Sequence, residues 1–256
     1  MEPLKHTEYI EPRFYDLAYS WYRDDVDFYL RAAREARGPV LEVGCGTGRI
    51  LLPALEVGAD VDGLDIHAGM LEELRKKAAT RGLKPHVMQA DMRDFTMVRR
   101  YALIMIPFRA FMHVLTTEDQ LRTLRCCREH LEPDGRLVLD LFFPNLERLL
   151  QATGERALER EFPHPGTGLP VRVWSRRVVD RVNQLLQAEM EVQESDLAGG
   201  VGATHPHRFT LRWTWKGEME LLLRVAGFKR WDVRGDFDGR PLESDTDHMI
   251  WTGWRD

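Results

Sequence analysis

A short turn with three alternating glycines and a nearby acid is the part of this chain best suited to chemistry. Residues 40–48 read VLEVGCGTG, an apolar run that ends in glycines at 44, 46 and 48. Glycine lacks a Cβ and tolerates positive φ, so its backbone can lie close to a bound molecule. Dinucleotide enzymes usually space these glycines G-x-G-x-x-G under a pyrophosphate. The tighter spacing here, with Glu42 just before the turn, disfavours a diphosphate and suits an ammonium or sulfonium group.

Two aspartates stand at the ends of the next apolar runs. Asp65 closes the run VDGLD, about where an acid accepts both hydroxyls of a ribose, and Asp91 follows the third run. A single aspartate in such a place is commonly a helix N-cap or a solvated strand end. Three such features in order, each at the carboxyl end of a predicted strand, indicate one ligand at that edge of a parallel sheet.

Taken together, residues 42–48 (EVGCGTG), 63–65 (GLD) and 90–92 (ADM) resemble the cofactor half of class I S-adenosylmethionine-dependent methyltransferases. The resemblance implies that the glycine turn surrounds the methionine half of the cofactor, that Asp65 holds the ribose, and that Asp91 reads the adenine amino edge. The cofactor-binding residues that it implies are Tyr15, Glu42, Gly44, Cys45, Gly46, Gly48, Asp65, Ile66, Met70, Asp91, Met92 and Pro107.

The fourth predicted strand ends where this family positions the methyl acceptor. The segment 106–113 (IPFRAFMH) offers two strongly polar side chains, Arg109 and His113, as candidate catalytic residues, against the alternatives of a surface ion pair and a buried histidine. The Asn-Pro-Pro-Tyr pattern of DNA amino methyltransferases is absent, which counts against a nucleobase acceptor. The expected substrate-binding residues are Phe108, Arg109, Arg172, Arg212 and Trp213.

Methyl transfer from a sulfonium is an in-line displacement with an activated donor. The protein mainly has to align acceptor, methyl carbon and sulfur, an effect worth roughly 7 to 11 kcal/mol in well-aligned intramolecular reactions. An amine or hydroxyl acceptor also has to lose a proton. A histidine such as His113 could accept it, contributing about 100- to 10,000-fold, whereas an acceptor of low pKa needs no base.

Composition narrows the class of protein. The 256 residues, 43% of them apolar, suffice for one large α/β domain with a modest insertion, and the polar N-terminus does not resemble a signal sequence. We expect a cytoplasmic enzyme. A net charge of −5 without a basic stripe disfavours nucleic acid as a partner. His205 and His207 lack a third ligand nearby, so we expect no metal site.

Apolar patterning predicts an α/β fold, a doubly wound, seven-stranded, mainly parallel sheet of the Rossmann-like methyltransferase type. An aromatic-rich helical segment at 1–37 comes first, and the resemblance implies that it closes over the cofactor. The segment 117–120 (TEDQ) reads as a capping box. The expected strands are 40–44, 60–64, 86–90, 101–106, 136–142, 228–234 and 248–254, and the expected helices are 48–57, 67–80, 118–130 and 217–226.

A Pro- and Gly-rich stretch at 163–170 marks a change of pattern. Period-two alternation beyond it predicts a three-stranded antiparallel meander. We therefore divide the chain into the segment 1–37, a cofactor-binding core at 38–150 and 216–256, and an inserted antiparallel lid at 151–215 that contributes to the substrate site.

The sequence thus predicts methyl transfer from S-adenosyl-L-methionine to a small-molecule N, O or C acceptor, without a membrane and with a homodimer left open. Three alternatives remain: a protein or RNA methyltransferase, a non-catalytic binder of the same cofactor, and an aminopropyl transferase, which would normally carry a dense acidic pocket.

Overall fold

The computed structural model describes residues 11–19, 21–198 and 200–256. They form two compact units. One contains the described residues of 11–22 together with 145–212, and the other contains 23–144 and 213–256. The second unit holds the glycine turn, and we call it the core unit; the first is the inserted unit.

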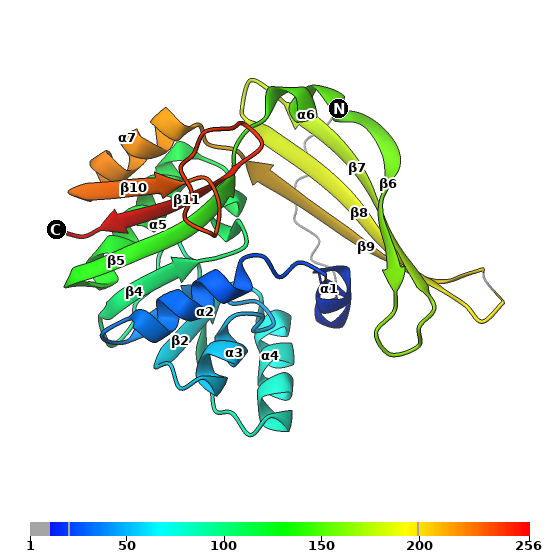
Figure 1. The fold of residues 1–256 in the computed structure, drawn as a ribbon, viewed down its shortest axis with the longest axis horizontal. Coiled ribbons are helices and arrows are strands. Elements are labelled where there is room, and N and C mark those ends of the chain that lie inside the picture. Colours follow the sequence, from blue (N-terminus) through cyan, green and yellow to red (C-terminus); the bar gives the residue numbers. More distant parts are fainter. Residues whose placement is uncertain (1–10, 20, 199) are drawn as a thin grey trace. The chain divides into compact units, whose positions relative to one another are not determined.

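The core unit is built on one seven-stranded sheet with the strand order β10-β11-β5-β4-β1-β2-β3 (Figure 1). Five strands pair in parallel, and β11 lies antiparallel between β5 and β10. This confirms the predicted fold class. The strands are β1 Val40–Val43, β2 Val61–Asp65, β3 His86–Gln89, β4 Tyr101–Ile106, β5 Leu131–Phe142, β10 Arg230–Arg234 and β11 His248–Trp254.

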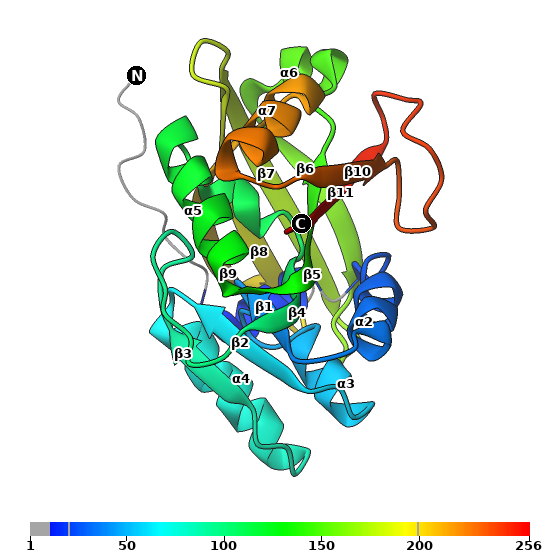
Figure 2. The same cartoon turned by 90° about the vertical axis from the view of Figure 1, so that its left-hand side faces the viewer.

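Helices cover both faces of this sheet. The helices α2, α3 and α4 lie on one side of it, and α5 and α7 lie together on the other (Figure 2). Their bounds are α2 Val26–Glu35, α3 Leu51–Glu56, α4 Ala68–Thr80, α5 Thr117–His130 and α7 Lys216–Ala226, and a short 3-10 helix, η1, spans Ala110–His113.

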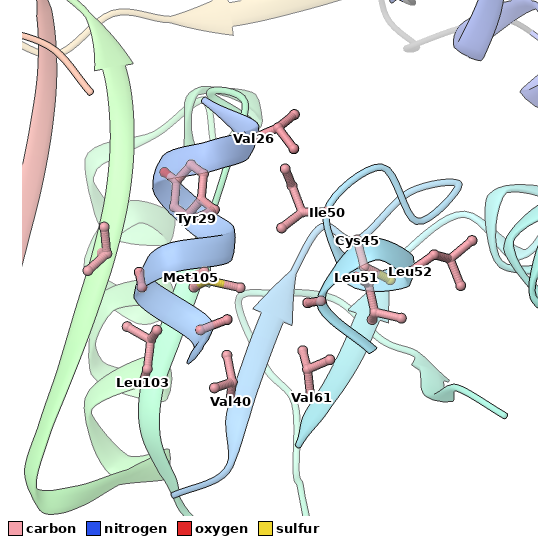
Figure 3. Packing of buried hydrophobic residues seen from close by; sticks show 14 of the residues in the cluster. Val26, Tyr29, Val40, Cys45, Ile50, Leu51, Leu52, Val61, Leu103 and Met105 are labelled. Atoms are coloured by element: carbon pink, nitrogen blue, oxygen red, sulfur yellow. The ribbon is translucent and has the colours of Figure 1, made fainter. Parts of the chain in front are cut away.

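The helix α2 is part of the core. Its apolar side chains recur at helical spacing, and Val26 and Tyr29 are buried against β1 and β4 residues such as Val40 and Met105 (Figure 3). The sequence predicts a single N-terminal segment at 1–37. The structure instead gives two helices, α1 Pro12–Tyr19 in the inserted unit and α2 in the core unit. The parts of that segment at 1–10 and 20 lie outside the described residues.

The start of α5 differs from the predicted capping box. Its N-cap is Thr116, whose side chain accepts a hydrogen bond from the backbone N–H of Asp119. Gln120 does not return to the helix start, because its side-chain amide donates to Thr214 Oγ1 at 3.2 Å in the buried contact between α5 and the segment before α7. The box prediction was wrong by one residue because Thr116 and Thr117 offer the same hydroxyl.

The inserted unit contains an antiparallel sheet of four strands, in the order β6-β7-β8-β9. Their bounds are β6 Thr153–Pro163, β7 Pro170–Asp180, β8 Leu185–Ser195 and β9 Val201–Arg212, and a short helix α6 Leu146–Gln151 precedes them. The sequence predicts three strands. It misses β6, whose charge-rich sequence TGERALEREFP lacks clear alternation.

Apolar residues of α1 cover part of this second sheet. Phe14 and Leu17 pack on Val171, Val173 and Val192. A helix laid on one face explains why the inward positions of β7 and β8 are apolar. Among the described residues of both units, no helix is long and apolar enough to cross a membrane.

Gly63 in β2 offers a test of the core packing beneath the glycine turn. A Cβ at this position would lie 2.4 Å from Leu51 Cδ1 and 2.9 Å from Cys45 Sγ. Gly63→Ala should therefore lower the free energy of unfolding by about 1–3 kcal/mol, as overpacked cores do. Gly217→Ala in α7 is the control, since its Cβ would meet nothing within 4 Å. Chemical denaturation measures both, and equal stability of the two variants would contradict this packing.

Candidate functional site

The glycine turn follows β1 at the carboxyl edge of the sheet. Gly44, Gly46 and Gly48 all have positive φ, at 76°, 53° and 86°. The N–H groups of Gly44 and Cys45 donate to Leu64 O at 2.8 and 3.0 Å, which ties the turn to β2. A Cβ on Gly46 would meet no atom within 4 Å. The turn therefore leaves open space directly above Gly46.

Asp65, the last residue of β2, holds this turn in shape. Its Oδ2 accepts a hydrogen bond from Gly46 N–H at 2.8 Å, and its Oδ1 accepts one from His67 N–H at 2.8 Å. Burial raises the pKa of Asp65, and the two N–H donors act in the opposite direction. A carboxylate has about four acceptor positions, so these two bonds leave capacity for further donors such as sugar hydroxyls.

The neighbours of Asp65 differ in their exposure. Ile66 is 51% exposed, so its apolar surface is open to a flat partner such as an adenine. Met70 is only 3% exposed and packs in the core. Cys45 is buried as well, and burial raises the pKa of its thiol, which agrees with a small residue that fills the turn.

Asp91 lies in a different setting from the one the sequence suggests. Both of its carboxylate oxygens accept hydrogen bonds from the side chain of Arg93, at 2.5–3.0 Å, and Arg93 also reaches Asp119 at 2.9 Å. The ion pair with Arg93 lowers the pKa of Asp91. An adenine amino group would have to share these oxygens, so the role of Asp91, with that of the Met92 backbone, stays a prediction.

Glu42 is an acid buried beneath the turn. It is 2% exposed, and its Oε2 has no hydrogen-bond partner among the described residues. Burial raises its pKa to about 8, although the charge of Arg49 acts against this. The carboxylates of Asp25 and Asp65 raise it further. A cation placed near Glu42 would stabilise its ionised form.

The segment after β4 is the second conspicuous feature of this edge. Pro107 is buried, and Phe108 and Arg109 both have positive φ, at 54° and 62°. Ala110 then starts η1 beside the glycine turn, since a Cβ on Gly44 would lie 3.0 Å from Ala110 Cβ. The predicted acceptor segment and the predicted cofactor turn are therefore in contact.

The remaining candidates are spread over both units. His113 ends η1 and is half-buried, and Trp213 is 3% exposed; both are in the core unit. Tyr15, Arg172 and Arg212 are in the inserted unit, where Arg172 Nε donates to Glu161 Oε2 at 2.6 Å. Arg212 is largely buried, at 7% exposure. No role of these five residues is tested by their positions.

Sequence reasoning missed a second buried acid at this edge. Asp140 in β5 is 1% exposed and accepts a hydrogen bond from Tyr29 Oη at 2.7 Å. The sequence does contain a signal for this acid. Asp140 directly follows the apolar residues 137–139 (LVL), and Asp65 likewise ends the segment VDGLD. Tyr29 belongs to an aromatic cluster whose members the sequence alone does not separate.

Comparison with known proteins agrees with this geometry. Residues 40–135 match the family model described as a methyltransferase domain. The cypemycin N-terminal methyltransferase of a Streptomyces species is 28% identical over 213 residues, covering 82% of this chain and 80% of the relative. The glycine/sarcosine N-methyltransferase of Halorhodospira halochloris is 26% identical over 233 residues, covering 89% and 80%.

The fold is shared with a solved S-adenosylmethionine-dependent methyltransferase from Clostridium acetobutylicum. The two superpose with a TM-score of 0.78 at 17% identity, over 94% of this chain and 96% of the other. The glycine turn, Glu42, Asp65 and the strands β1 to β4 lie within residues 40–135, which match the methyltransferase domain. The chain thus carries a methyltransferase domain and is an S-adenosylmethionine-dependent methyltransferase with the class I fold.

Proposed function

We propose that this enzyme methylates an amino nitrogen of a small molecule. The support comes from two relatives that align with more than four fifths of the chain, because one is named as an N-terminal methyltransferase and the other as an N-methyltransferase. Within the structure, two observations support the cofactor half of the proposal: the open space above Gly46, and the Oε2 of Glu42, which has no partner among the described residues.

The residues of the glycine turn fit S-adenosylmethionine. Gly46 leaves room for the ligand, Glu42 offers a carboxylate oxygen to its ammonium group, and Asp65 retains acceptor capacity for ribose hydroxyls. When bound, the cofactor supplies a methyl group already activated by a sulfonium. The protein then needs to orient the acceptor and to exclude water.

The segment after β4 suits the acceptor role. Phe111 and Met112 are fully buried, so this part of the segment is shielded from water. An amine attacks only in its neutral form, and His113 is the group in this segment whose ordinary pKa lies near neutrality. We propose His113 as the proton acceptor and Arg109 as a contact for the substrate.

The inserted unit holds further candidate residues for the acceptor. From the family resemblance, we propose that it contributes Arg172 and Arg212 to recognition of the acceptor, and that Tyr15 and Trp213 belong to the same functional region. We also propose that the enzyme is cytoplasmic and that it has no nucleic-acid partner; the net charge of −5 supports the second point. The oligomeric state is left open.

The proposed function predicts methylation of amines. Purified protein should be incubated with S-adenosylmethionine and glycine, sarcosine or a peptide with a free N-terminal alanine. The matched hydroxyl controls are glycolate and the same peptide with a hydroxyl group in place of its terminal amine. Mass spectrometry should show addition of a methyl group to at least one amine, with release of S-adenosylhomocysteine.

Methylation of the hydroxyl controls without any amine product would contradict the choice of nitrogen. If the protein binds the cofactor tightly but methylates neither the amines nor the hydroxyl controls, it should also be incubated with an extract of small metabolites. No methylated product in that extract would favour a non-catalytic binder.

Because the pKa of Glu42 is raised, we expect binding of the cofactor to release a proton. Its pKa near 8 leaves it mostly protonated at pH 7 in the free protein, and a bound ammonium group favours its ionised form. Between pH 6 and 7, where a ligand α-amino group of pKa about 7.7–8.0 stays charged, affinity for S-adenosylhomocysteine should rise about tenfold per pH unit. Calorimetry in buffers with different heats of ionisation measures the released proton.

Glu42→Gln should abolish the proton release and flatten the pH dependence, whereas Glu72→Gln, on the exposed face of α4, should change neither. The raised pKa also means that Glu42 stabilises the free protein at low pH and that this contribution is lost as pH rises through about 8. A wild-type affinity that does not vary between pH 6 and 7 would exclude this role of Glu42.

A further inference from the structure

The turn after β4 is held in a conformation that its residues rarely adopt. Phe108 and Arg109 are consecutive, neither is glycine, and both have φ in the left-handed region, at 54° and 62°. Each such residue costs roughly 1–3 kcal/mol, and this strain persists only where the surroundings hold it. The contacts that hold this turn are therefore informative.

Asp140 holds the second residue of the turn. Its Oδ2 accepts a hydrogen bond from the backbone N–H of Arg109 at 3.1 Å, and its Oδ1 accepts one from Tyr29 Oη at 2.7 Å. Asp140 is 1% exposed and Tyr29 is fully buried, so both bonds are shielded from water. The aspartate thus connects α2 through β5 to the strained turn.

A second connection from α2 holds the first residue. Arg49 forms a two-pronged ion pair with the buried Asp25, with both N–O distances at 2.6 Å. Its guanidinium also lies over the ring of Phe108, 4.5 Å from the centroid. Asp25 and Tyr29 are four residues apart and therefore lie on one side of α2. Both strained residues are consequently fixed from the same helix.

The Phe108–Arg109 turn lies next to the glycine turn, so its conformation affects the site. Ala110, the next residue, contacts the glycine turn at Gly44. The side chain of Arg109 extends over Phe142 at the end of β5, 5.9 Å from the ring centroid. In open α/β sheets the ligand lies at this carboxyl edge. A shift of the turn would therefore displace Phe108 and Arg109 at the place where the acceptor is expected.

We propose that Asp140 and Tyr29 are positioning residues for methyl transfer, which hold the strained Phe108–Arg109 turn and thereby place these two side chains toward the acceptor. This inference rests on the proposed function. Asp140 remains able to accept both bonds at neutral pH, because burial raises its pKa only to about 6. The facing groups Tyr29, Arg109 and Arg49 favour its ionised form, and Asp25 opposes it.

The same sheet offers a matched control. Tyr101 Oη donates to Asp62 Oδ2 at 2.8 Å, and both residues are buried. Tyr101 is the first residue of β4, so this tyrosine–aspartate pair lies at the opposite, amino edge of the sheet. Tyr101→Phe removes the same kind of bond as Tyr29→Phe without touching the turn.

The test compares Tyr29→Phe, Asp140→Asn and Tyr101→Phe on the amine that the wild type methylates. The first two should lower kcat/KM for the acceptor by up to about 100-fold, as small misplacements do, while calorimetric affinity for S-adenosylhomocysteine stays within about threefold of the wild type. Tyr101→Phe should lower Tm to a similar extent and leave kcat/KM unchanged. Equal kinetics in all three variants would overturn the proposal.

Amide hydrogen exchange at Arg109 separates this inference from the proposed function. The Arg109 N–H should be protected in the wild type and exchange faster in Tyr29→Phe and Asp140→Asn, but not in Tyr101→Phe. If no amine is methylated, the proposed function fails and exchange alone decides whether Asp140 holds the turn. Asp140→Ala removes both acceptor oxygens, and unchanged protection of Arg109 in a folded Asp140→Ala protein would overturn the inference in either case.

Discussion

The hydrogen bond between Asp65 and Gly46 N–H is the interaction on which the site depends. It joins the end of β2 to the open part of the glycine turn, at 2.8 Å. The turn adopts positive φ at three glycines, and without a fixed acceptor such a backbone would have many alternatives. The same carboxylate caps the start of the segment leading to α4 through His67 N–H. One acid thereby fixes the shape of the turn while it keeps acceptor capacity for a ligand.

Buried acids extend this arrangement across the carboxyl edge. Glu42 lies beneath the turn, Asp140 holds the turn after β4, and Asp25 pairs with Arg49. Burying carboxylates is unfavourable unless they are hydrogen-bonded or paired. Both oxygens of Asp140 and both of Asp25 accept hydrogen bonds, whereas Oε2 of Glu42 has no partner among the described residues. Among these three acids, Glu42 is therefore the one whose burial the described residues leave uncompensated at Oε2.

Local patterns predicted the fold well because β1, β2 and β4 are short apolar runs, which end before Gly44, at Asp65 and before Pro107. The sequence could also place Glu42, Asp65 and the β4 segment at one edge, since parallel strands share their carboxyl ends. It could not predict the Asp91–Arg93 pair, the burial of Met70 or the link from Tyr29 to Asp140. The Tyr29–Asp140 bond joins residues 111 positions apart in the chain, and Arg93 is shared between Asp91 and Asp119, which lies 26 positions further on. Local spacing carries no information about such distant partners. The sequence prediction also missed β6. This charge-rich segment has no strand pattern of its own and forms a strand by pairing with β7.

If the open space above Gly46 receives the cofactor, a side chain placed there should weaken binding, and calorimetric titration with S-adenosylhomocysteine measures this. Gly46 and Gly58 both have positive φ, +53° and +82°, and a Cβ at either would meet nothing within 4 Å. Gly46→Ala and Gly58→Ala should therefore lose similar stability, about 1–2 kcal/mol, but only Gly46 faces the ligand. We expect Gly46→Ala to weaken binding at least about tenfold, or roughly 1.4 kcal/mol, and Gly58→Ala to bind as the wild type does. Unchanged affinity in a folded Gly46→Ala protein would contradict this position of the cofactor.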